Sequence, residues 1–283
     1  MTSPIAHFNG RLVPLDDIRI SPLDRGFLFG DGVYEVVPAY GGKLLRAREH
    51  FARLQRSMDE IALANPMTID GWVDAVNALL AHHPGDQAVY IQVTRGVPPK
   101  RDHVIPQGLA PTVFMMASPM TNPSKEMVDK GVACVSASDF RWHKCHIKSV
   151  SLLGNVLARQ ISADAGATET VLFRDGYLTE AAASNVFVVK GGTVYAAPQD
   201  NHILLGITYE LLAELARSGE LKFEVRPVAE TLVRAADEIW LSSSTKEVLA
   251  VTTLDGKPVG AGVPGPVFKR MHALFQAYKA KLA

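Results

Sequence analysis

A single lysine stands in the stretch Cys145–Asn155, which reads CHIKSVSLLGN. The residues around Lys148 are mostly apolar or carry hydroxyl groups, and burial of an ammonium group without a partner is costly. One interpretation is a lysine at a strand end whose head group reaches water. The other is a nucleophile whose pKa is lowered by apolar surroundings, as Schiff-base chemistry with a carbonyl compound requires. The second interpretation needs a carbonyl partner.

Glu180 is a second residue that could do chemistry. It lies in LTEAAASNVF and is the only acidic residue between Asp175 and Asp200. Alone it could cap a turn. Beside a pyridine nitrogen, an ionised carboxylate would keep that nitrogen protonated, so that the ring withdraws electrons from an attached carbanion.

Two short segments have the composition of anion sites. Gly206, Ile207 and Thr208 precede a predicted helix, whose first N–H groups can bind an anion together with the threonine hydroxyl. The segment LSSSTKE places hydroxyl groups in a turn after a strand, which could form a second anion nest. Arg53, in EHFARLQRS, could add a cation, although a solvated helix face explains it equally well.

Two other patterns do not support a site. The segment FGDGVYE has two glycines of a dinucleotide-binding loop, but Glu35 stands where the third would be. His143, Cys145 and His146 could suggest a metal site, but on a strand His146 would point away from the other two. We expect no metal.

The composition places these residues in an ordinary globular protein. The 283 residues are 47% hydrophobic and 20% charged, which predicts a soluble chain with an ample core. The formal net charge is +0, so nothing favours nucleic acid or an anionic membrane as a partner. The two cysteines make no disulfide framework, and we see no signal peptide or membrane-spanning run. We expect a cytoplasmic protein.

The order of the predicted elements indicates an α+β chain in two parts. Apolar residues recur at helical spacing in residues 47–63, where Phe51, Leu54, Met58 and Ile61 form one face. Glycine-containing pairs predict hairpin turns, for example at Asn9-Gly10. Residues 1–118 are expected to form a small N-terminal domain, residues 119–129 an interdomain linker, and residues 130–283 a larger C-terminal domain.

The motifs together resemble the fold-type IV family of pyridoxal-phosphate enzymes. They occur in the family's order and span nearly the whole chain: DRGFLFGDGVYEVV, EHFARL, YIQVTRG, RWHKCHIKSVSLLGNVLA, LTEAAASNVF, ILLGIT and SSSTKE. The resemblance implies a small N-terminal α/β domain, a larger C-terminal pseudo-barrel domain, and pyridoxal 5′-phosphate in the cleft between them. It also implies a homodimer whose active sites are completed across the interface.

Within the family, the chain most resembles the D-amino-acid transaminases, and this implies a role for each matching residue. Lys148 matches the Schiff-base lysine and Glu180 the carboxylate at the pyridine nitrogen. Further matches are Arg53, Ile207, Thr208 and Ser244 at the phosphate, Leu204 and Ser243 against the ring, and Tyr34, Arg101 and His103 at the substrate carboxylate. TRGVPPKRDHVIP carries one more residue than the family pattern, so either Lys100 or Arg101 could be the clamp.

The implied reaction moves the amino group of a D-amino acid to a 2-oxo acid, such as 2-oxoglutarate or pyruvate, in ping-pong half-reactions through Lys148. An (R)-selective amine transaminase is the main alternative, and it would accept amines that lack a carboxylate. A branched-chain L-aminotransferase, an aminodeoxychorismate lyase and a non-catalytic binding protein are further alternatives. The preferred D-amino acid, the acceptor and the strictness of D over L selectivity stay open.

Overall fold

The computed structural model describes residues 3–282, and within this range the chain forms two compact units. The first contains the chain up to Met120 and the short segment Ile147–Leu152. The second contains Thr121–His146 and Leu153–Lys281. Lys148 therefore packs with the first unit, although the chain on either side of its segment belongs to the second.

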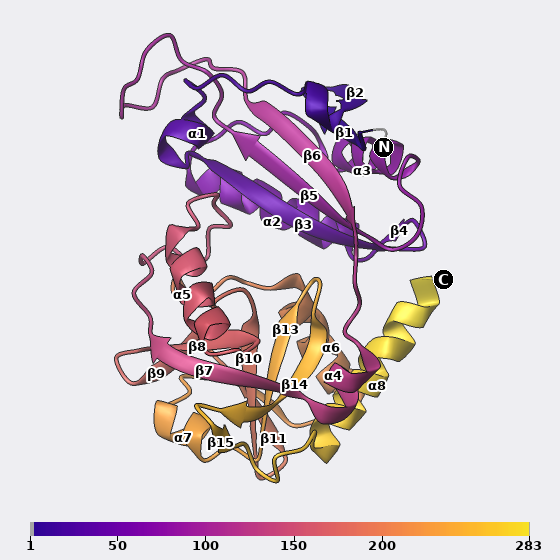
Figure 1. Ribbon diagram of the computed structural model, residues 1–283, viewed down its shortest axis with the longest axis vertical. Coiled ribbons are helices and arrows are strands. Elements are labelled where there is room, and N and C mark those ends of the chain that lie inside the picture. The colour runs from indigo at the N-terminus through magenta and orange to yellow at the C-terminus, as the bar shows by residue number, and fades with distance from the viewer. Residues whose placement is uncertain (1–2, 283) are drawn as a thin grey trace. The chain divides into compact units, whose positions relative to one another are not determined.

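The first unit is a sheet covered by two helices on one face (Figure 1). Within the described residues the sheet has six strands, all antiparallel, in the order β2-β1-β6-β5-β3-β4. Its elements are β1 (Ile5–Phe8), β2 (Arg11–Pro14), α1 (Arg25–Phe29), β3 (Gly32–Tyr40), β4 (Lys43–Leu44), α2 (Ala47–Glu60), α3 (Ile69–Leu80), β5 (Gln87–Thr94) and β6 (Thr112–Pro119).

Apolar faces of α2 and α3 form the core of this unit against the sheet. Phe51, Leu54 and Met58 of α2 are fully buried, which confirms the predicted helix face, and Trp72 of α3 stacks near Phe51. The predicted turn at Asn9-Gly10 is also confirmed, since both residues have a positive φ and join β1 to β2.

The second unit contains the longer sheet. Within residues 3–282 it has nine strands, in the order β12-β11-β10-β13-β14-β7-β8-β9, with β15 paired to β14. Its elements are α4 (Lys125–Lys130), β7 (Val132–Ser138), α5 (Leu153–Asp164), β8 (Glu169–Arg174), β9 (Tyr177–Ala181), β10 (Asn185–Lys190), β11 (Thr193–Ala196), α6 (Ile207–Ser218), β12 (Phe223–Val225), α7 (Glu230–Arg234), β13 (Glu238–Ser243), β14 (Glu247–Leu254), β15 (Lys257–Pro258) and α8 (Pro266–Lys279).

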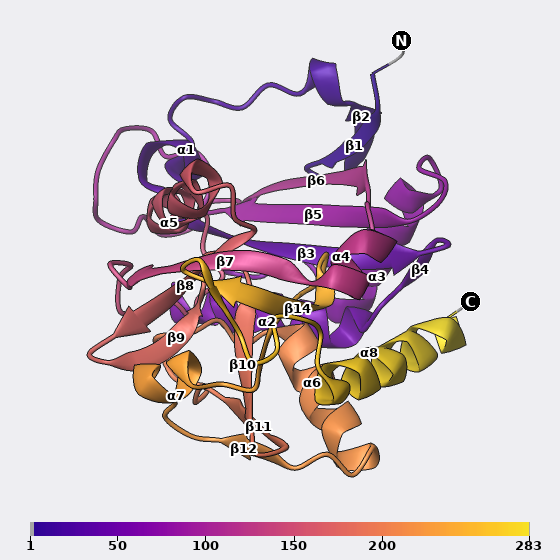
Figure 2. The ribbon, with the colours of Figure 1, turned by 60° about the horizontal axis from the view of Figure 1, so that its bottom comes forward.

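The sheet of the second unit curls, which confirms the predicted pseudo-barrel. Strand β9 ends the strand order, yet it also contacts β10, so the sheet turns back on itself. Helices α6 and α8 pack side by side and against β13 (Figure 2). Tyr209 of α6 packs on Phe187 of β10, which also contacts Trp240 of β13, and all three side chains are buried. None of the helices within residues 3–282 has both the length and the apolar character that a membrane span requires.

Candidate active site

Lys148 is held by its backbone beside strand β3 of the first unit. Its carbonyl accepts the N–H of Tyr34 at 2.9 Å, and its own N–H donates to Ser57 Oγ at 3.2 Å. The half-buried side chain lies over the Tyr34 ring, with Nζ 4.2 Å from the ring centroid. The first unit thus brings together two predicted site residues, Lys148 and Tyr34.

Arg53 is buried and does not lie on a solvated helix face. It donates from Nε to Glu35 Oε2 at 2.9 Å and from Nη2 to Glu35 Oε1 at 2.5 Å. His50 Nδ1 lies 3.1 Å from the same carboxylate. Glu35, His50 and Arg53 are each at most 4% exposed, so they form a buried charged cluster next to the segment of Lys148.

The protonation states in this cluster follow from burial and from Arg53. Burial alone would raise the pKa of Glu35, but Arg53 and His50 outweigh it and hold that pKa well below its usual range. Burial lowers the pKa of His50, against the pull of Glu35, and the nearby Lys148 adds to the lowering. Glu35 is therefore an anion that fixes the guanidinium of Arg53. Strand alternation, which places Glu35 on the face of Val33 and Val37, is the signal that could have predicted its burial.

Arg101 and His103 meet on one aromatic ring of the first unit. The guanidinium of Arg101 lies 4.9 Å from the centroid of Phe29, and the His103 ring lies 5.1 Å from it. Tyr34 stacks instead on Tyr90, at 5.6 Å between centroids. Phe29 was not among the predicted site residues, because nothing in the local sequence connects it to a loop more than 70 residues away.

Glu180 is the centre of a hydrogen-bonded cluster in the second unit. It is 5% exposed and accepts from Arg141 Nη1 at 2.5 Å, from Asn185 Nδ2 at 3.2 Å and from the N–H of Leu204 at 3.1 Å. Asn185 also donates to the Leu204 carbonyl at 2.9 Å. Arg141 and Asn185 were not predicted, although both lie in motifs that carry the family resemblance.

The pKa of Glu180 reflects a balance between burial and these donors. Burial raises the pKa to about 7, and Arg141 is the main group that opposes the rise. The Asp139 carboxylate accepts from Nε and Nη2 of Arg141, both at 2.9 Å, which keeps the guanidinium in place. Glu180 can therefore hold or release a proton near neutral pH, which suits a carboxylate that faces a basic ring nitrogen.

The two predicted anion sites lie in the second unit. Helix α6 begins after Gly206, which has no side chain to cap it, so the first N–H groups can face an anion. Ile207 and Thr208, its first residues, are buried. In the serine turn, Ser243 Oγ accepts the N–H of Lys246 at 3.0 Å, and Ser244 beside it is half-buried.

Lys246 anchors the serine turn to a buried carboxylate. Lys246 Nζ lies 2.9 Å from Oε1 of the fully buried Glu169, and Ser184 donates to the same oxygen at 2.8 Å. These contacts fix the turn without using Ser243 or Ser244. Backbone N–H groups, hydroxyls and a buried carboxylate are the donor and acceptor types that a phosphorylated pyridine needs, so the residues present fit pyridoxal 5′-phosphate.

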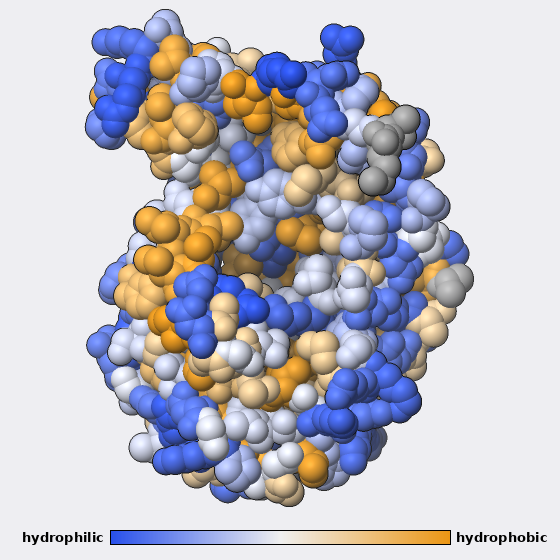
Figure 3. Space-filling view, viewed as in Figure 1, coloured by the Kyte–Doolittle hydropathy of each residue, from blue (hydrophilic) through white to orange (hydrophobic). Residues whose placement is uncertain are grey.

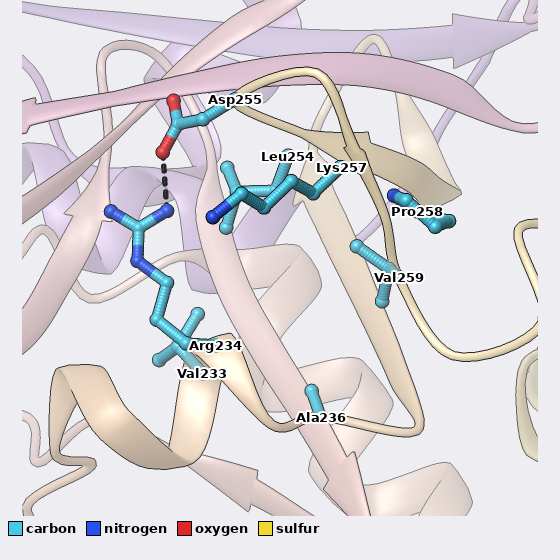
Figure 4. A pocket seen from close by; sticks show the side chains of 8 residues that line it. All are labelled: Val233, Arg234, Ala236, Leu254, Asp255, Lys257, Pro258 and Val259. Carbon is cyan, nitrogen blue, oxygen red and sulfur yellow. Dashed lines mark hydrogen bonds and ion pairs between the residues drawn. The ribbon is translucent and has the colours of Figure 1, made fainter.

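A separate pocket of about 420 Å³ lies among α7, β14 and β15 (Figure 4). Arg234 points into it and pairs with Asp255 and Glu230, so its charge is compensated. The predicted site residues are not among those that line it. This pocket therefore does not belong to the candidate active site.

The comparison with known proteins decides the family. The model of the family described as amino-transferase class IV matches residues 32–254. The chain belongs to the class IV aminotransferases. It is 38% identical over 270 residues to a D-alanine aminotransferase of Bacillus licheniformis, with 95% of each chain covered. It is 36% identical to a D-alanine aminotransferase of Staphylococcus epidermidis, with 95% of this chain and 96% of the relative covered. This aminotransferase therefore depends on pyridoxal 5′-phosphate, as the resemblance implied.

Solved structures confirm the fold of this aminotransferase. The branched-chain amino acid aminotransferase of Escherichia coli superposes with a TM-score of 0.92 over 99% of this chain and 94% of its own, at 23% identity. That of Thermoproteus uzoniensis gives 0.89 over 99% and 95%, also at 23% identity. At this identity the likeness concerns the fold-type IV architecture and not the substrate.

Proposed function

We propose that this aminotransferase transfers the amino group of a D-amino acid to a 2-oxo acid such as 2-oxoglutarate or pyruvate. The observation that carries the proposal is that Arg101 and His103 both contact the Phe29 ring, since a guanidinium and an imidazole are groups that bind an α-carboxylate. The names of the relatives, D-alanine aminotransferases at 36–38% identity, support a D-amino acid as donor.

Each residue of the proposed site has a defined task. When bound, the cofactor supplies a carbonyl carbon for amines and a ring that withdraws electrons from the substrate's α-carbon. Lys148 would hold the cofactor through Nζ until the substrate's amine takes its place. The freed Nζ then takes the proton from the substrate's α-carbon as a base and delivers it as an acid to the carbon that was the cofactor's carbonyl carbon. Glu180 holds the proton of the ring nitrogen, and Arg141 and Asn185 keep its carboxylate in place.

The remaining residues bind and orient. Arg53, the start of α6 at Ile207 and Thr208, and Ser244 bind the phosphate, while Leu204 and Ser243 lie against the ring. Tyr34, Arg101 and His103 bind the substrate carboxylate. A fixed carboxylate determines which hand of amino acid directs its α-hydrogen toward Lys148, and this is the proposed origin of D selectivity.

We further propose that the enzyme is a homodimer whose sites are completed across the interface. Leu153, Val156 and Leu157 on α5 are 71%, 59% and 52% exposed, and Figure 3 shows hydrophobic side chains gathered over this helix. A stripe of this kind is typical of a contact surface, and a second copy of the chain is the expected occupant. The free thiols of Cys134 and Cys145 suit the cytoplasmic location that we propose.

A half-reaction screen tests the reaction. Purified enzyme is mixed with D-alanine, L-leucine or (R)-1-phenylethylamine, and the absorbance of the bound cofactor is followed. We expect a rapid change with D-alanine, no change with Lys148→Ala, and normal behaviour for Lys144→Ala, an exposed lysine of the same segment. A faster response to L-leucine or to the amine would instead assign the branched-chain or (R)-amine activity, and pyruvate release without an acceptor would assign the lyase.

Light scattering after size exclusion tests the dimer. We expect the wild type at twice the chain mass, and Leu157→Glu as a monomer with reduced D-alanine turnover. Val263→Glu changes a residue that is 60% exposed elsewhere in the second unit and should stay dimeric. A Leu157→Glu protein that remains dimeric and fully active would contradict the proposed interface.

A further inference from the structure

The loop that carries Arg101 and His103 is not held by core packing. It connects β5 to β6, and the side chains of residues 101–105 are all exposed. A loop with so little burial is expected to move unless other groups fix its backbone. Its precision for a carboxylate must therefore come from contacts made by another element.

Arg25, the first residue of α1, makes those contacts. Its side chain is 4% exposed and donates to three successive carbonyls of the loop: Nη1 to Asp102 O at 2.5 Å, Nη2 to His103 O at 3.3 Å, and Nη1 to Val104 O at 3.4 Å. A guanidinium is suited to this because its donors form a planar fork. The loop backbone on both sides of His103 is thus tied to one buried cation.

Arg25 is in turn fixed by an ion pair with Asp31. Its Nε donates to Asp31 Oδ2 at 2.7 Å, and Arg95 grips the same carboxylate at 2.8 and 2.9 Å. Arg95 also donates to the carbonyls of Ile61 and Ala62, which lie at the end of α2. These contacts therefore connect the loop, through Arg25, Asp31 and Arg95, to the end of α2.

Asp24, the residue before Arg25, holds the two ends of the loop together. Asp24 caps α1 by accepting the N–H of Gly26 at 2.8 Å. Its other oxygen accepts the hydroxyls of Thr94, which ends β5, and Thr112, which begins β6, at 3.0 and 2.7 Å. The two ends of the loop therefore meet at one buried carboxylate.

Phe29, four residues after Arg25 on the same short helix, orients the side chains of the loop. Its ring lies 4.9 Å from the guanidinium of Arg25 and 4.9 Å from that of Arg101. Lys100, by contrast, has a side chain that is 79% exposed and faces Asp102 at 3.7 Å. The ring contact therefore favours Arg101 over Lys100 as the carboxylate clamp.

We propose that Arg25, together with Phe29, is a positioning residue that sets Arg101 and His103 for the α-carboxylate and so determines the preference for amino acids over amines without a carboxylate. The proposal rests on the proposed function, in which this loop binds the carboxylate. If it is correct, loss of Arg25 affects only ligands that carry a carboxylate.

The test uses the holoenzyme with Arg25→Lys, Arg25→Ala and, as a matched control, Arg48→Ala, whose side chain is 72% exposed. A displaced binding loop costs on the order of 10- to 100-fold, so we expect kcat/KM for D-alanine to fall by that factor, mainly through KM. Inhibition by D-lactate, which has the carboxylate but no amine, should weaken in parallel. The slow half-reaction with (R)-1-phenylethylamine should stay within about twofold of the wild type.

A readout independent of turnover is amide hydrogen exchange of residues 102–105, which should quicken in both Arg25 variants and not in Arg48→Ala. Equal losses for D-alanine and the amine, or unchanged exchange, would overturn the proposal. If Arg25→Ala does not fold, Arg25→Lys decides, because it keeps a cation beside Asp31 but cannot span three carbonyls. Arg101→Ala distinguishes a failure of the carboxylate site from a failure of the positioning role. Normal D-alanine kinetics in Arg101→Ala would refute the carboxylate site itself. Impaired kinetics in Arg101→Ala together with normal kinetics in the Arg25 variants would refute only the positioning role.

Discussion

Replacement of Glu35 by glutamine should strongly destabilise the first unit. The side chain is fully buried, and Glu35→Gln removes the negative charge that the buried guanidinium of Arg53 contacts. Removal of one partner of a buried ion pair costs roughly 3–5 kcal/mol. Glutamine keeps one acceptor for Arg53, so we expect a loss near the lower end, about 3 kcal/mol.

Thermal unfolding of the cofactor-free protein at pH 7.5, followed by circular dichroism, measures this loss. For a domain of this size about 1 kcal/mol lowers Tm by roughly 2–4 °C, so the expected decrease is about 6–12 °C. Asp70→Asn is the matched control, since it breaks the Arg48–Asp70 pair, whose side chains are 72% and 75% exposed. An exposed pair contributes about 0–1 kcal/mol. If Glu35→Gln melted within about 2 °C of this control, the cluster would not stabilise the fold as argued.

Three further predictions concern the clusters around the site. Arg141→Met should raise the pKa of Glu180 above about 7, so cofactor affinity in an absorbance titration should drop more at pH 7 than at pH 9; an equal drop would contradict this. Gly206→Ala would place a Cβ 2.1 Å from Asn185 Oδ1 and so displace the Asn185 amide from Glu180. Cofactor binding should then weaken about five- to tenfold. Unchanged affinity would show that the amide is dispensable. Because burial lowers the pKa of His50 from 6.5, the unfolded chain binds a proton that the folded chain does not, and stability in urea should fall as the pH falls below about 6.5. His50→Gln should flatten that slope.

Local patterns were sufficient to predict some elements of the fold. The apolar spacing of Phe51, Leu54 and Met58 predicted α2, because a helix that covers a sheet must bury one face. The pair Asn9-Gly10 predicted a hairpin because both residues tolerate a positive φ. These signals depend only on neighbours in the sequence.

The pairs that support the site could not be predicted in the same way. Glu35 meets Arg53 because α2 crosses β3 at one particular place, and the sequence of either element alone does not encode that crossing. Arg25 donates to backbone carbonyls 77 to 79 residues away, and the side-chain sequence does not indicate which carbonyls a distant residue will contact. The roles of Lys148 and Glu180 were assigned through the resemblance, since each residue alone had an ordinary explanation.

The membership of Ile147–Leu152 in the first unit has a consequence for dissecting this protein. A fragment that stops at Met120 would omit Ile147, a member of the first unit's core, and would leave the N–H of Tyr34 and the carbonyl of Gly32 without the partners they have in Lys148 and Val150. The unit is therefore not a contiguous piece of the gene. An autonomous version would need residues 147–152 grafted onto it, so an engineered split would have to keep Lys148 with the first unit.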